Sequence, residues 1–161
     1  MLIPMIVSSI FVLTVIALCL FKPNGGRIFL GIFFLVMAIG VNGSFTFANP
    51  YAYLDYAKGA LIPFYRDLAI AIVSINPLVF GLLLMAFEIT MGLFLLHKQK
   101  FVKIGLIGTM FFLLGIAPLS LLQLPWLGLI VGELYLFRKD FDISVLDTLQ
   151  SKLRYQNNRA A

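Results

Sequence analysis

Long apolar runs with at most one charged side chain each dominate this sequence and restrict what it can fold into. The first run, Leu2 to Phe21, contains no Asp, Glu, Lys or Arg. As a helix it is about 30 Å long, which matches the hydrocarbon core of a bilayer. Because 61% of the 161 residues are hydrophobic and only 12% are charged, a soluble domain of this size could not bury so much apolar surface. The sequence therefore predicts an all-α transmembrane helical bundle surrounded by lipid.

Five apolar segments are predicted to cross the membrane. They cover about residues 2–21, 28–48, 77–96, 101–122 and 124–137. The stretch between the first two, Lys22 to Arg27, has the Pro-Asn-Gly-Gly composition of a turn. The last segment has only fourteen residues, fewer than the roughly 20 expected of a span, so the prediction that it crosses depends on the distribution of charge.

The basic residues predict the orientation. With five crossings the N-terminus lies outside, the C-terminus lies in the cytoplasm, and all twelve Lys and Arg except Lys58 and Arg66 lie on the inner side. The positive-inside rule favours this arrangement in the cell membrane, whereas four crossings would place the C-terminal basic residues outside. The net charge of +5 is thus explained by topology, and the sequence has no continuous basic face that would bind nucleic acid.

Residues 51–66 are too polar to span the membrane. Four tyrosines alternate there with charged residues, a composition that suits a segment at headgroup depth. Its end, Tyr65-Arg66-Asp67, is predicted either to form a surface ion pair or to bind an anionic headgroup. A short helix is expected between this segment and Asn76-Pro77, where proline interrupts the helical pattern.

Residues 140–161 are predicted to form a short cytoplasmic tail. Asp142 is expected to cap a short helix in it. Four apolar residues would share one face of that helix, namely Val145, Leu146, Leu149 and Leu153. Such a helix would lie on the inner membrane surface or on a partner protein.

Glu88 is the polar residue that most needs an explanation. It lies eight residues, about 12 Å along a helix, from the inner end of the third predicted span. A charge near the bilayer centre costs on the order of 3 kcal/mol, so Glu88 is either a proton-carrying or ligand-binding carboxyl or a protonated structural acid. A structural acid would be hydrogen-bonded to Asn42, Ser44, Thr46 or Thr90, and the predicted buried polar site consists of Glu88, Asn42, Ser44 and Thr90.

Further polar residues are secondary candidates. Glu133 lies four residues, about 6 Å, from the inner end of the last segment, where an interfacial carboxylate could reach Arg138 or water. Asn76 is expected either to make ordinary turn contacts or to line an outward-facing cavity. The other residues expected to line that cavity are Asn42, Gly43, Ser44 and Gln123. Arg66 is the third secondary candidate. The Gly128-x-x-x-Gly132 pattern is expected to pack helices within the bundle rather than to specify a dimer.

One cysteine, Cys19, and one histidine, His97, limit the chemistry of a single subunit. They exclude an intrachain disulfide and a site with several histidines, and no catalytic, cofactor or metal site is predicted. The prediction is a non-enzymatic bundle that binds lipid or another membrane or soluble protein, with an oligomeric state that the sequence leaves open. Another hypothesis is proton-coupled transport of a small solute through Glu88.

The segment from Phe87 to Leu96, in which Gly92 follows Glu88, precedes a basic turn and an apolar stretch over residues 104–114. With the helix-ending Asn49-Pro50, this pattern resembles the DoxX-like superfamily of small membrane proteins. The resemblance covers residues 28–137 and implies a four-helix core, to which the first run adds one N-terminal helix. Members include a subunit of a thiosulfate:quinone oxidoreductase, proteins that accompany methylamine-oxidising enzymes, and assembly chaperones for membrane receptors. The resemblance therefore implies, as an alternative function, a membrane subunit of a quinone-linked oxidoreductase.

Overall fold

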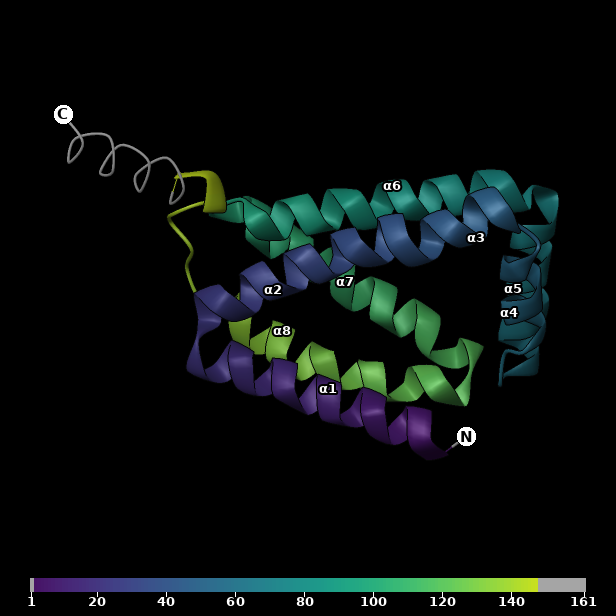
Figure 1. Ribbon diagram of the computed structural model, residues 1–161, viewed down its shortest axis with the longest axis horizontal. Coiled ribbons are helices and arrows are strands. Elements are labelled where there is room, and N and C mark those ends of the chain that lie inside the picture. The colour runs from purple at the N-terminus through teal and green to yellow at the C-terminus, as the bar shows by residue number, and fades with distance from the viewer. Residues whose placement is uncertain (1, 148–161) are drawn as a thin grey trace.

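The computed structural model describes residues 2–147, and every element in this part of the chain is helical (Figure 1). The predicted all-α class is thus confirmed for these residues. In chain order the elements are α1 (Leu2–Phe21), α2 (Pro23–Val36), the π-helix η1 (Met37–Asn42), α3 (Gly43–Ala48), α4 (Ala52–Lys58), α5 (Pro63–Ile75), α6 (Pro77–Leu96), α7 (Lys100–Ile116), the 3₁₀ helices η2 (Ala117–Leu119) and η3 (Leu121–Gly128), and α8 (Leu129–Phe137). A last helical turn begins at Val145.

Within residues 2–147, four helices are long and apolar enough to cross a membrane, which makes this a multi-pass membrane protein. They are Leu2–Phe21, Pro23–Ala48, Pro77–Leu96 and Lys100–Leu119. In Figure 1 they run along the long axis of the molecule, whereas α4 and α5 stand across one end of the bundle. The expected short helix before Asn76-Pro77 is α5, and the segment after Asn49-Pro50 is α4 rather than a span.

The second span begins earlier than the sequence predicts. The predicted turn over residues 22–27 is wrong after Lys22, because α2 begins at Pro23, where proline loses no hydrogen bond and its fixed φ suits a helix start. Gly26 of that stretch serves helix packing instead of a turn. A Cβ on Gly26 would lie 2.7 Å from Cys19 Cα, so glycine allows α2 to approach the end of α1 closely.

The last apolar run gains length from its 3₁₀ helix. The chain turns at Ser120 and not at Gln123, so the predicted bounds 101–122 and 124–137 are each shifted. The eight residues of η3 and the nine of α8, at about 2.0 and 1.5 Å per residue, extend about 30 Å in total. This run lies antiparallel to α7, and the N-terminus and the C-terminal segment lie at opposite ends of the bundle (Figure 1).

Two glycines, Gly128 at the end of η3 and Gly132 in α8, allow this run to pack on α1. A Cβ on Gly128 would lie 2.7 Å from Val12 Cγ1, and one on Gly132 would lie 3.2 Å from Cys19 Sγ. The prediction that this glycine pattern packs helices within the bundle is confirmed. Around this contact the buried core includes Val15, Leu30, Phe34, Leu106 and Leu129.

Arg27 holds the other end of the bundle together, although the sequence places it in a solvated inner loop. Its side chain is completely buried. It donates hydrogen bonds to the carbonyl oxygen of His97, to Asn24 Oδ1 at 2.6 Å and to the carbonyl oxygen of Ile143 at 3.1 Å. The guanidinium carbon also lies 4.8 Å from the centroid of the Phe141 ring, a cation–π distance. Arg27 thus joins α2, the α6–α7 turn and the C-terminal segment.

The helical turn that begins at Val145 is capped by Ser144 and not by Asp142, the predicted cap. The amide of Asp147 donates to Ser144 Oγ at 3.0 Å, and the amide of Ser144 donates to Asp147 Oδ2 at 3.1 Å, a reciprocal capping pattern. Lys98 Nζ donates to the same carboxylate at 2.9 Å. This hydrogen bond is the main reason that the pKa of Asp147 falls to about 2. Leu149 and Leu153 of the predicted apolar face lie outside the described residues.

Candidate ligand cavity

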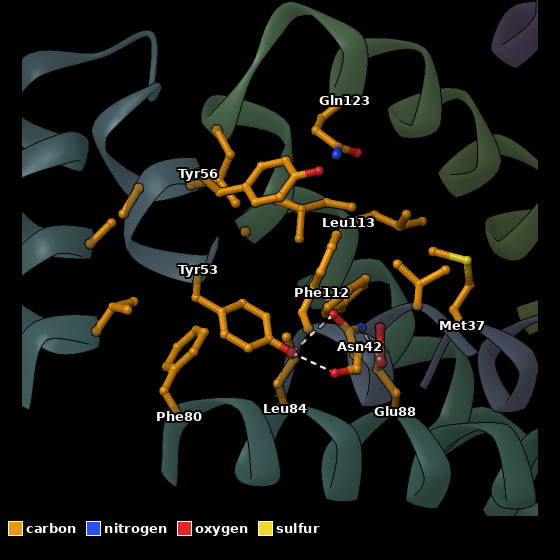
Figure 2. Close-up of a pocket in the computed structure, with 18 of the residues that line it drawn as sticks. Met37, Asn42, Tyr53, Tyr56, Phe80, Leu84, Glu88, Phe112, Leu113 and Gln123 are labelled. Carbon is orange, nitrogen blue, oxygen red and sulfur yellow. Dashed lines mark hydrogen bonds between the residues drawn. The ribbon is translucent and has the colours of Figure 1, made fainter. Parts of the chain in front are cut away.

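A cavity of about 440 Å³ lies where α4 and α5 meet the ends of the longer helices (Figure 2). This volume falls within the range of roughly 300 to 1,000 Å³ typical of small-molecule sites. Its walls are mainly apolar and rich in aromatic rings, which come from Phe33, Phe34, Phe45, Tyr53, Tyr56, Tyr65, Phe80, Phe112 and Trp126. Rigid rings of this kind hold an apolar body by dispersion and ring-face contacts.

One wall of the cavity is polar and fully connected by hydrogen bonds. Asn42 Nδ2 donates to Glu88 Oε2 at 2.6 Å. The hydroxyl of Tyr53 donates to the carbonyl oxygen of Asn42 at 3.0 Å and lies 2.9 Å from Thr46 Oγ1, from which it can accept. Figure 2 shows the Tyr53 hydroxyl directed at Asn42. Burial raises the pKa of Tyr53, which favours the neutral phenol that this network needs as a donor.

Local backbone geometry brings this wall together. Asn42 is the last residue of the π-helix η1, after which the amide of Gly43 donates to the carbonyl of Ala38, five residues back. Such widened turns are rare and often occur at functional sites. Glu88 faces Asn42 from α6 and shares a helical face with Leu84 and Phe80, four and eight residues earlier.

Gly81 of α6 makes room for the Thr46–Tyr53 pair. A Cβ at this position would lie 2.4 Å from Thr46 Oγ1 and 2.7 Å from Tyr53 Cε2. Sequence reasoning missed this function of Tyr53, which it treated only as an interfacial tyrosine, and it named Thr46 only as one of four alternative partners of Glu88. Only one signal pointed to the pair: Thr46 is one of three polar residues, with Asn42 and Ser44, in the apolar span 28–48.

The helix α5 covers the cavity with one face. Its lining residues are spaced three or four apart, as one face of a helix requires: Tyr65, Leu68, Ala69, Ile72 and Val73. The Tyr65 hydroxyl of α5 donates to the carbonyl of Gly115 at the end of α7, and the amide of Leu61, just before α5, donates to the carbonyl of Pro118 in η2 at 2.8 Å. Leu68 and Ile72 are also partly exposed on the surface.

Of the predicted buried polar site, the structure brings together only Asn42 and Glu88. Ser44 and Thr90 are exposed, and each donates to a carbonyl of its own helix, of Gly40 at 2.6 Å and of Ala86 at 2.7 Å respectively. Neither borders the cavity. Intrahelical bonding of this kind is the usual way for a hydroxyl on an apolar helix surface to be satisfied.

Of the remaining polar candidates, some line the cavity and others lie outside it. Gln123 lines the cavity, whereas Asn76 caps α6 by accepting from the amide of Val79 at 3.1 Å. Arg66 forms the predicted ion pair with Asp67, at 3.6 Å between Nε and Oδ1, with both side chains exposed. Asn76 and Arg66 therefore lie outside the cavity wall.

Glu133 is buried in a different part of the bundle and does not line the cavity. Neither of its carboxyl oxygens has a hydrogen-bond partner among residues 2–147, so the expected contact with Arg138 is absent there. Its neighbours are Cys19 and Thr109. The Thr109 hydroxyl has a single proton and lies 3.0 Å from the carbonyls of Gly105 and Leu106, to which it donates.

The geometry of the cavity defines what it can do. Its aromatic walls suit an apolar body, and its polar wall offers an amide, a phenol and a carboxyl at one place. Comparison with known proteins gives no match for this chain among protein-family models, curated proteins or solved structures.

Proposed function

We propose that this protein is a multi-pass cell-membrane protein that binds an amphipathic lipid or similar apolar small molecule, without catalysing a reaction. The observation that carries the proposal is the cavity of about 440 Å³ with aromatic walls and one hydrogen-bonded polar wall. Sites of this form bind through apolar contact, while a few polar groups fix the orientation of the ligand. Glu88 and Asn42 would contact the polar head.

The single tryptophan, Trp126, lines the cavity and provides the test. In protein reconstituted into nanodiscs, a brominated lipid that enters the cavity should quench Trp126 fluorescence at saturable, low concentration. Ala69→Phe fills the cavity from α5, whereas Ala71→Phe lies on the same helix but does not line it. We expect the first change to abolish saturable quenching and the second to leave it intact. Equal quenching in both variants would refute the proposal.

The proposed topology has five crossings, with the N-terminus outside and the C-terminus in the cytoplasm. Its support is the length of η3 and α8 together, about 30 Å, and the position of Lys98, Lys100 and Lys139 at the end of the bundle where the C-terminal segment lies. Lys58 lies in α4 at the opposite end. This topology places the cavity in the outer half of the membrane.

Labelling of cysteines in intact cells tests this topology. Because Cys19 is buried, it should give little background. A cysteine that replaces Lys58 should react with an impermeant maleimide, and one that replaces Lys139 should react only after the membrane is permeabilised. The opposite pattern would overturn the orientation, and reaction of both in intact cells would overturn the fifth crossing.

Membership of the DoxX-like superfamily stays a proposal. The two residues that match the pattern of that superfamily, Glu88 and Gly92, differ in what they contact. Glu88 borders the cavity, while a Cβ on Gly92 would lie 2.9 Å from the carbonyl oxygen of Gly31. Gly92 therefore serves the packing of α6 on α2. Binding to a second membrane or soluble protein is likewise a proposal, and co-purification from native membranes in mild detergent tests it.

A second candidate function is a membrane subunit of a quinone-linked oxidoreductase. The observation that favours it is the pairing of flat aromatic walls with a hydrogen-bond donor, the Gln123 amide, because a quinone is a flat ring with acceptor oxygens. Another subunit would have to supply the redox cofactor. Extraction of purified protein with organic solvent should then release quinone in stoichiometric amount, and extraction of a different lipid alone would reject this candidate.

A further inference from the structure

Among the residues that line the cavity, Glu88 has no opposing cation. The residues that line it include one carboxyl, Glu88, and no Lys, Arg or His. The two cations of the helices that cover the cavity are paired on the surface. Lys58 lies 3.1 Å from Asp55 Oδ1 and Arg66 lies 3.6 Å from Asp67 Oδ1. Within residues 2–147, the cavity wall therefore has no cation that would neutralise a bound anion.

The carboxyl of Glu88 has an oxygen left for a ligand. Asn42 Nδ2 bonds Oε2, and among residues 2–147 no donor bonds Oε1. Asn42 is itself held from the other side by the Tyr53 hydroxyl, 3.4 Å from Asn42 Oδ1. The network therefore fixes the direction of the carboxyl while leaving one acceptor oxygen at the cavity.

Aromatic rings surround the same polar wall. Tyr53 packs edge-on against Phe80, with ring centroids 5.5 Å apart, and Phe34 packs edge-on against Phe112 at 5.7 Å. Figure 2 places Tyr53 and Phe112 beside Asn42 and Glu88. Ring faces next to a carboxylate attract an organic ammonium, because cation–π attraction and a charge-assisted hydrogen bond act on the same group.

We propose that the ligand of this cavity is a lipophilic amine, that is, an apolar body carrying one protonated amino group. The inference rests on the proposed ligand-binding function and adds the class of head group. The ammonium donates to Glu88 Oε1 and lies against the ring of Tyr53 or Phe112, and the apolar body extends toward α5. A fatty acid or phospholipid phosphate would meet Glu88 as a like charge without a counterion, which is unfavourable. A neutral head would gain the hydrogen bonds but no charge attraction.

Three matched probes test the head group: 11-bromoundecylamine, 11-bromoundecanol and 11-bromoundecanoate. They share one apolar chain, and their bromine quenches Trp126. With quenching in the cavity-filled Ala69→Phe variant subtracted as membrane background, we expect the amine to reach half-maximal quenching at about ten-fold lower concentration than the other two, a difference equivalent to about 1.4 kcal/mol. Equal concentrations for all three, or tighter binding of the carboxylate or of a short-chain quinone, would overturn the amine inference and leave ligand binding itself standing.

Two variants assign the preference to Glu88. Glu88→Gln keeps an acceptor for Asn42 and should reduce the preference for the amine over the alcohol to less than about two-fold, while the alcohol still quenches. Glu133→Gln changes a buried carboxyl outside the cavity and should keep the full preference. Loss of preference in both variants, or in neither, would overturn the inference. Absence of saturable quenching by every probe in the unmodified protein would overturn both this inference and the proposed function.

Discussion

Two buried carboxyls of this protein lie in opposite surroundings. Glu88 is 1% exposed, accepts a hydrogen bond from Asn42 and borders a cavity. Glu133 is 0% exposed, has no hydrogen-bond partner within residues 2–147 and lies against the closely packed contact of α8 with α1. Burial alone therefore does not identify a ligand site. A carboxyl becomes a candidate where the surrounding helices leave space and provide partners that orient it.

The helices pack more closely around Glu133 than around Glu88. Close contacts to Cys19 at Gly26 and Gly132 leave no room for a Cβ between α1, α2 and α8. Near Glu88 the π-helix and the crossing helices α4 and α5 leave the cavity instead. Five predictions test this contrast, in order of decreasing expected effect.

Gly26→Ala should have the largest effect on stability. Its new Cβ would lie 2.7 Å from the backbone of Cys19, whereas a Cβ on Gly40 would meet nothing within 4 Å. We expect Gly26→Ala to lower the free energy of unfolding by about 3 kcal/mol, as overpacking does, and Gly40→Ala to be neutral or stabilising by up to about 1 kcal/mol. Chemical unfolding in detergent micelles measures both. Equal stability of the two variants would show that the contact of α1 with α2 is looser than described.

Glu133→Met should stabilise the protein. The carboxyl has no hydrogen-bond partner in the described structure, so an apolar side chain of similar length removes a desolvation cost of about 2 kcal/mol. Thermal unfolding of the reconstituted protein measures the change. Destabilisation would mean that Glu133 has a partner outside residues 2–147 or a bound water, which would weaken the contrast with Glu88.

Glu88→Met should act in the opposite direction. It leaves the buried Asn42 amide without its acceptor, a loss of about 1.5 kcal/mol. The same unfolding measurement used for Glu133→Met applies, so the two variants form a matched pair. If both substitutions change stability with the same sign, the two carboxyls do not differ in the way described here.

Tyr53→Phe removes the hydroxyl that joins Thr46 to Asn42. We expect a loss of about 1 kcal/mol in stability, together with weaker orientation of Asn42 in the cavity wall. Tyr56 also lines the cavity and is partly exposed, so Tyr56→Phe is the control and should change stability by less than about 0.5 kcal/mol. A larger loss at Tyr56 than at Tyr53 would contradict the network.

The smallest effect is expected at a third carboxyl, Asp147, which lies on the surface. Its pKa is lowered to about 2 from 3.8 by hydrogen bonds from Lys98 and Ser144. A lowered folded-state pKa stabilises the C-terminal turn above pH 3.8, and this contribution is lost as the pH falls toward 2. Hydrogen exchange of the Asp147 amide should therefore accelerate over that range beyond its intrinsic change. Asp147→Asn should remove this pH dependence, and an unchanged profile in that variant would exclude the ion pair as its cause.

Part of the site could be predicted, because an acidic side chain inside an apolar membrane helix is energetically unfavourable wherever it occurs. Glu88 is noticeable as an acid inside an apolar run, and only a few polar residues lie at a depth that allows them to satisfy it. Its partner Asn42 was among them. Ser44 was not distinguishable from Asn42 by depth, because the choice between these two depends on how the π-helix rotates the chain before α3. Thr90 lies two residues after Glu88 on α6, and residues two apart on a helix do not face each other.

Other residues depend on contacts far apart in the chain. Arg27 has the sequence context of an inner loop, yet it is buried because the carbonyls of His97 and Ile143 meet it from segments 70 and 116 residues away. Tyr53 likewise joins Asn42 only because Gly81 leaves space between α6 and α3. No pattern within a short window specifies such neighbours.

The sequence by itself determined that the chain forms apolar membrane helices and where most of the charges lie relative to them. These properties follow from the transfer of each segment between water and lipid, which depends on composition and length alone. Only the tertiary structure decided which buried carboxyl has a partner and a cavity, and that Arg27 joins α2 to the α6–α7 turn and the C-terminal segment. Those outcomes depend on the rotation and close approach of helices, because a hydrogen bond forms or is lost within a few tenths of an ångström.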